Sequence, residues 1–171
     1  SLMPFVYQIA DLGRQWSVLV HSRMLTYAHV LDFDTKFRAL LSSLPIFLRP
    51  DPTLEQLPEV RQEQAQRPYL AMHRLIVFEA VNQRLLVLHR DDMCRGHHDE
   101  KFAYSTRVAV DAARTILSCR QQIDNVHPAV QKHAAFRHHL FQAAIVLSIH
   151  LLELSHKAQG ESQVAHQLRD D

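Results

Sequence analysis

Residues 68–90, PYLAMHRLIVFEAVNQRLLVLHR, decide the fold. On a helix, the apolar residues of this stretch surround most of the circumference, as shown by Leu70, Phe78, Val81, Leu85 and Leu88. A helix that is apolar on nearly every side must be covered by other elements, because each apolar face has to leave water. The stretch therefore predicts a central, buried helix.

Narrower apolar stripes lie on both sides of this stretch. Before it, apolar residues recur with helical spacing over residues 4–24 and 27–44, and Pro45 ends the second run. After it, residues 103–123 and 128–154 show the same spacing. Only three glycines occur, which leaves little material for hairpins. We predict an all-α fold, a bundle of about five antiparallel-type helices.

The second and third predicted helices are joined by a proline-rich segment, residues 42–67, which also carries a polar Gln/Glu stretch. We expect a long, exposed connection there, and a charged turn at residues 91–101. Residues 1–154 are expected to form one helical domain, long enough to have a real core. Residues 155–171 are polar, and we expect a frayed C-terminal tail.

The charge and the cysteines of the chain limit its function class. Nineteen Lys and Arg residues balance eighteen Asp and Glu residues, and a net charge of +1 gives no electrostatic case for binding nucleic acid. No apolar run reaches the ~18 residues that a membrane span needs. Cys94 and Cys119 are too few for a disulfide scaffold. These features favour a soluble, intracellular protein that contacts no membrane.

Three segments, in this order, resemble the pattern of a known family. The first is residues 27–51, YAHVLDFDTKFRALLSSLPIFLRPD. The second is Arg67-Pro-Tyr-Leu, followed by residues 82–90, NQRLLVLHR. The third is Tyr104-Ser105 with residues 110–117, VDAARTIL. The chain resembles the fungal-specific transcription factor domain, also called the middle homology region, of zinc-binuclear-cluster regulators.

The resemblance carries expectations about function. It implies the later half of a longer helical regulatory domain in a nuclear activator or repressor, because the family's domains are longer than this chain. Such a domain is not an enzyme, and it modulates transcription through co-regulator proteins or a small-molecule effector. Zinc is implied only for an upstream six-cysteine cluster, so DNA would be contacted through a missing domain and this fragment would need no cofactor.

Truncation of a larger domain has a further consequence for partners. Removing the earlier half would expose apolar surface, which self-association tends to cover. We therefore expect a dimer or a larger species.

The motif residues that stand out are interpreted as structural. His89 and Arg90 end the central helix, where cationic side chains interact favourably with exposed carbonyl groups. Arg90 is expected to pair with Asp34 or Asp92, and Asp34 to act as a cap or as an ion-pair partner that holds the second helix against the third. Effector binding by His89 and Arg90 is the alternative. The full set of motif residues is Asp34, Pro45, Leu88, His89, Arg90 and Tyr104.

The sharpest candidate for a metal site is the turn Cys94-Arg-Gly-His97-His98-Asp99, which offers a thiol and two imidazoles within five residues. Adjacent histidines rarely reach one ion, so a solvated polar turn is the favoured interpretation. The remaining helical histidines include His29, His73 and five between residues 133 and 156, and none forms the His-Glu-x-x-His pattern of a metalloprotease.

Two alternatives to the regulatory domain stay open. One is a histidine-dependent, metal-binding helical enzyme, although Ser105, Ser118 and Cys119 lack the sequence signatures of known nucleophiles. The other is a helical module for protein interaction or assembly. Elemental analysis of untagged protein distinguishes the first alternative, and the oligomeric state bears on the second.

Overall fold

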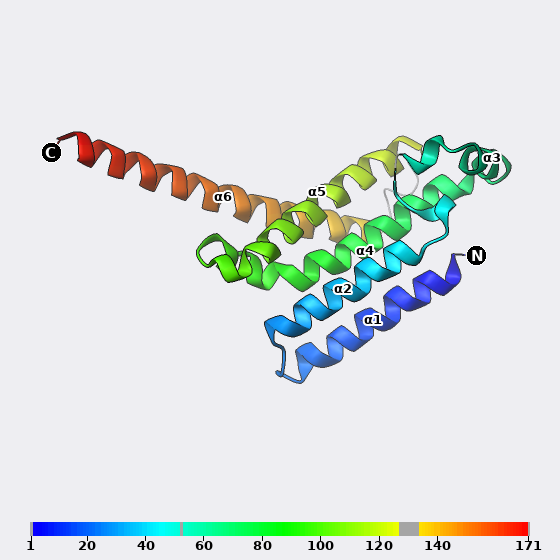
Figure 1. The fold of residues 1–171 in the computed structure, drawn as a ribbon, viewed down its shortest axis with the longest axis horizontal. Helices are drawn as coiled ribbons and strands as arrows, with labels where there is room; N and C mark the ends of the chain where they lie inside the picture. Colours follow the sequence, from blue (N-terminus) through cyan, green and yellow to red (C-terminus); the bar gives the residue numbers. More distant parts are fainter. Residues whose placement is uncertain (1, 52, 127–133, 171) are drawn as a thin grey trace.

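A computed structural model of the chain describes residues 2–51, 53–126 and 134–170 (Figure 1). Within these ranges the chain forms α-helices and short 3₁₀ turns, and no β-strand. This confirms the predicted all-α class, with six α-helices in place of about five. The helices are α1 (Met3–His21), α2 (Tyr27–Ser43), α3 (Pro58–Gln66), α4 (Tyr69–Met93), α5 (Ala103–Val126) and α6 (Ala134–Asp170).

Helix α4 is the centre of the bundle, as its apolar circumference predicts. It packs against α1, α2, α5 and α6. Val81 and Leu86 are fully buried, and Leu88 is 2% exposed. In Figure 1, α4 lies between the α1–α2 pair on one side and α5 on the other. Because neighbours cover most of its circumference, the side chains of α4 connect all the long helices.

Helices α1 and α2 form a hairpin on one side of α4. Trp16 of α1 packs edge-on against Phe33 of α2, with 5.5 Å between the ring centroids. Thr26 caps α2, and its backbone N–H donates to His29 Nδ1 at 3.2 Å in a capping box. One of the helical histidines is thus used as a cap.

The connection between α2 and α4 is exposed over much of its length, as its prolines suggested, but it is not an irregular loop. It holds the 3₁₀ turns η1 (Ile46–Leu48) and η2 (Leu54–Gln56), followed by α3. Leu48 and Val60 are each only 2% exposed. Nothing in the sequence indicates these buried positions, because isolated apolar residues among prolines show no period.

Two contacts fix this connection to the rest of the fold. Arg74, buried on α4, donates to the Phe47 carbonyl at 3.1 Å and forms an ion pair with Glu55. Pro58 begins α3, where a residue without a backbone N–H costs nothing because the first helical turn has no partner for it.

A short turn joins α4 to α5, as predicted. It contains η3 (Arg95–His97) and η4 (Glu100–Phe102). Gly96 lies so close to the Thr106 side chain and the Phe102 carbonyl that a methyl group at its Cα would collide with both. The turn is therefore tightly folded rather than solvated on all sides.

Helix α6 differs from the prediction at its C-terminal end. The sequence suggested a helix from Pro128 to about Leu154 and then a frayed tail, but the helix is continuous through Asp170; Pro128 lies outside the described residues. In Figure 1 its later half extends away from the bundle. The segment after Leu154 is mostly polar, and a polar sequence can form a helix without an apolar stripe.

None of the described helices combines the length and the apolar character that crossing a bilayer requires.

Candidate functional site

A buried polar network links α2, α4 and α5. At its centre lies Asp34 of α2, which is 4% exposed. One carboxylate oxygen of Asp34 lies 3.2 Å from His89 Nε2, and the other accepts from Arg38 Nε and from the Tyr104 hydroxyl, each at 2.8 Å. Because a carboxylate only accepts, His89 Nε2 is the donor in its contact.

The network continues on the other side of His89. Its Nδ1 lies 2.9 Å from Ser105 Oγ, and Ser105 Oγ donates to the Tyr27 hydroxyl at 3.1 Å. His89 and Ser105 are fully buried. Tyr27 lies at the start of α2 and Ser105 near the start of α5, so the network closes a chain of contacts across three helices.

The environment strongly favours the ionised form of Asp34. Burial raises its pKa, but hydrogen bonds from His89, Arg38 and Tyr104 outweigh this effect and lower the pKa from 3.8 to about 2. For Tyr104, burial and the hydrogen bond to Asp34 raise the pKa of the hydroxyl, which keeps it as a donor. The network therefore holds a negative charge in the protein interior.

This charge predicts a loss of stability in acid. Because folding lowers the pKa of Asp34, its carboxylate stabilises the folded protein above about pH 3.8. This stabilisation is lost as the pH falls towards 2. A depression of this size corresponds to about 2 kcal/mol of unfolding free energy. In urea titrations at pH 5, 4, 3 and 2, the stability difference between the wild type and Asp34→Asn should shrink by that amount. A difference that stays constant over this range would contradict the assignment.

The structure brings three of the sequence-predicted motif residues together, namely Asp34, His89 and Tyr104. The expected contact between the second and third predicted helices exists, but His89 makes it, not Arg90. Arg90 is exposed and lies 3.4 Å from Asp91. Successive helical residues point about 100° apart, so when His89 faces α2, Arg90 turns towards solvent.

The other predicted pairing of Arg90 is also wrong. Asp92 pairs with Arg95, one turn further on, at 2.8 Å. Leu88 lies in the core, and the Pro45 carbonyl accepts from the Leu48 backbone N–H at 2.8 Å, which starts η1.

Sequence reasoning missed Tyr27 and Ser105 as members of the network. A signal for Tyr27 was available, because it precedes Asp34 by seven residues and two helical turns place both on one face. Ser105 follows Tyr104 directly, and nothing in the sequence indicates that both neighbours reach the same cluster.

The order Ser105, His89, Asp34 matches the residue types of a hydrolase triad, but its setting does not suit that chemistry. A nucleophile must reach substrate, whereas Ser105 and His89 are fully buried. The Ser105 hydroxyl is also directed to Tyr27. The arrangement suits a link between three helices.

The metal candidate, the turn from Cys94 to Asp99, docks against α6. His97 Nε2 lies 3.3 Å from His150 Nδ1, and His98 Nε2 lies 3.2 Å from Glu153. Burial and the neighbouring His150 lower the pKa of His97. In the parts of the chain that the structure describes, no three His, Cys, Asp or Glu side chains are placed to hold a metal ion.

The remaining members of that turn and the other histidines have separate contacts. The Asp99 carboxylate accepts from the Lys101 backbone N–H at 2.9 Å, and Cys94 is exposed. His139 Nδ1 lies 3.0 Å from Glu79, and the His73 ring lies 5.0 Å from that of Tyr69. His133 lies outside the described residues.

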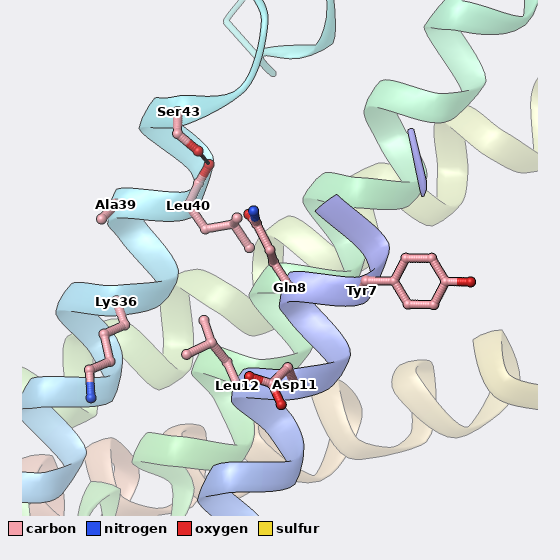
Figure 2. Close-up of a pocket in the computed structure, with 8 residues that line it drawn as sticks. All are labelled: Tyr7, Gln8, Asp11, Leu12, Lys36, Ala39, Leu40 and Ser43. Atoms are coloured by element: carbon pink, nitrogen blue, oxygen red, sulfur yellow. Dashed lines mark hydrogen bonds between the residues drawn. The ribbon is translucent and has the colours of Figure 1, made fainter. Parts of the chain in front are cut away.

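An open groove of about 620 Å³ lies between α1 and α2. Figure 2 shows Leu12 and Leu40 pointing towards one another across it, while the Tyr7 ring points away from α2. The charged residues at its edge have partners on their own helices, since Lys36 pairs with Asp32 and Asp11 with Arg14. An open apolar groove of this kind suits a packed side chain or helix better than a polar metabolite.

A second hollow, of about 540 Å³, borders the buried network between α2, α4 and α5. Arg38 and Tyr104 form part of its wall, together with Arg107. Its size is in the range of small-molecule sites. It is the hollow from which a bound group would contact the Asp34 network.

Comparison with known proteins points to one class. No family model and no solved structure matches the chain. Over 125 residues, 72% of its length, the chain is 30% identical to the agnestins biosynthesis cluster transcription factor AgnL11 of Paecilomyces divaricatus. Over 131 residues, 74% of its length, it is 25% identical to the probable transcription factor lepB of Aspergillus flavus.

Both relatives are named as fungal transcription factors. The similarity covers 17% of the first relative and 23% of the second, so the chain spans less than a quarter of either protein.

Proposed function

We propose that this chain is a regulatory segment of a fungal transcription factor, corresponding to the later half of a middle homology region and lacking a DNA-binding head. Two relatives named as fungal transcription factors support the class. The observation that carries the finer assignment is the buried network. Each of the three segments that resemble the family pattern contributes at least one side chain to it, as Asp34, His89 and Tyr104 show.

The proposed segment acts in the nucleus through contacts rather than through chemistry. Asp34 and His89, at the centre of the polar network, are buried, and the groove between α1 and α2 is open and apolar, which favours a co-regulator protein as partner. The hollow beside Arg38 and Tyr104 is the place where a small effector would alter the packing of α2 on α4. With a net charge of +1, the segment leaves DNA contact to another part of the protein.

A tethering assay tests this function. The segment is fused to an unrelated DNA-binding domain in a fungal reporter strain with intermediate basal expression. We expect the fusion to change reporter output several-fold in either direction, compared with the DNA-binding domain alone. A fusion carrying Leu88→Asp, which removes the fold, serves as the control and should have no effect.

Two results would contradict the proposal. One is a wild-type fusion that is expressed at a normal level but behaves like the DNA-binding domain alone. The other is stoichiometric zinc or iron in protein purified without a His tag or a metal column, which would favour the metal-dependent alternative.

A further inference from the structure

Helix α6 has an unpartnered apolar face. Its inner face packs on the bundle, where Ala143 is fully buried and Val146 is 3% exposed. On the opposite face, large apolar side chains remain in solvent, with exposed fractions of 65% for Phe141, 64% for Leu151 and 61% for Leu152. Scattered exposed apolar residues are ordinary in proteins, but a continuous stripe of them marks a contact surface.

The spacing shows that these residues form one stripe. At 100° per residue, they lie within about 60° on either side of the direction of Ser148. We call this set the α6 stripe: Phe141, Ala144, Ile145, Ser148, Leu151 and Leu152. All six are exposed, and none is charged. Exposed polar residues continue the same face at either end, Arg137 before the stripe and Gln159 after it.

We propose that the α6 stripe is a dimer interface, in which two copies of the chain pair their α6 helices antiparallel about Ser148. The sequence of the stripe carries this choice of partner. An antiparallel pair centred on Ser148 places residues at equal distances before and after it opposite each other. Leu152 of one copy then meets Ala144 of the other, and Ile145 meets Leu151.

The same register matches large residues with small ones at the ends. Phe141 of one copy meets Ser155 of its partner, and Ser155 is itself exposed on this face. A parallel pair would place Phe141 against Phe141 and Ala144 against Ala144, which alternates crowding with gaps. Interfaces pack as densely as protein interiors, so the antiparallel register is the one that fits.

The available area suits a second copy. If a fully exposed large apolar side chain offers on the order of 200 Å², the exposed parts of Phe141, Ile145, Leu151 and Leu152 supply on the order of 450 Å² per copy. With the small and flanking residues, two copies together bury on the order of 1,000 Å², about the smallest area that a specific interface needs. The interface does not depend on the proposed function, and its test is independent of the reporter assay.

Sedimentation velocity of three variants tests the interface. The wild type is expected to sediment as a dimer, and Leu152→Glu as a monomer with unchanged helicity by circular dichroism. Val18→Glu is the matched control, because Val18 is 59% exposed on α1, far from the stripe in sequence; this variant should remain dimeric. A monomeric wild type, a dimeric Leu152→Glu or a monomeric Val18→Glu would overturn the proposal.

Oxidative cross-linking tests the orientation, in a Cys94→Ser background that leaves only the buried Cys119. In the antiparallel pair, Ser148→Cys lies opposite its own copy and should form a disulfide-linked dimer. Two Ser155→Cys residues would be about 21 Å apart, fourteen residues at 1.5 Å each, and should not link. Linking of Ser155→Cys as readily as Ser148→Cys, or of neither variant, would overturn the arrangement.

Discussion

Leu88→Asp is expected to unfold the chain. Leu88 is 2% exposed on α4, the helix against which α1, α2, α5 and α6 all pack. An aspartate there must either bury an unpaired charge or open the core, and either costs more than ~5 kcal/mol. A loss of this size approaches the whole stability of a typical domain. Circular dichroism at 222 nm should show most of the helical signal gone at room temperature.

A matched substitution separates the effect of burying the charge from the effect of placing an aspartate in a helix. Leu117 on α5 is 39% exposed, so Leu117→Asp places the same charge on a helix beside water. It should retain the helical signal and lose about 1 kcal/mol or less. If Leu88→Asp melted like Leu117→Asp, α4 would not be the central helix of this fold.

Asp34→Ala should be the second most damaging change. It removes the acceptor shared by His89, Arg38 and Tyr104, and leaves the fully buried His89 without its carboxylate partner. A buried donor left without its acceptor costs about 1–3 kcal/mol, and Asp34→Ala removes the acceptor of both His89 and Tyr104, so we expect a loss of about 3 kcal/mol. Urea denaturation at pH 7 should show this loss as a lower midpoint with little change in the slope of the transition.

Asp32 supplies the control for this experiment. It lies on the same helix and pairs with Lys36 at 2.6 Å, but the Asp32 side chain is 53% exposed. Since surface ion pairs contribute little, Asp32→Ala should lower stability by less than ~0.5 kcal/mol. Equal losses for Asp32→Ala and Asp34→Ala would show that the network does not stabilise the fold.

The sequence predicts the long helices because each carries a regular apolar stripe, and α4 is the clearest case. It does not reveal α3 or the packing of the connection, where Leu48 and Val60 are buried one at a time between prolines. It also gives no signal for the helical continuation of α6 after Leu154, where residues 155–160 are all exposed and need no apolar stripe.

The sequence could predict some of the residues that belong to the candidate site, but not which of them contact each other. Asp34, His89 and Tyr104 stand out as motif residues, whereas their meeting depends on how α4 is rotated near its end. That rotation directs His89 inward and Arg90 outward, a difference set by the packing of three helices together. Local pattern does not encode it.

The buried network also has a consequence for the order of folding. Asp34 is 55 residues from His89 and 70 from Tyr104, whereas α4 and α5 are joined by one short turn. The α4–α5 pair closes a small loop and can assemble early. Docking α2 onto this pair closes a much longer loop, and the entropic cost of closing it is larger. We therefore expect the α1–α2 hairpin to detach before α4 and α5 separate in native-state opening, with the Asp34 hydrogen bonds contributing to the free energy of that step.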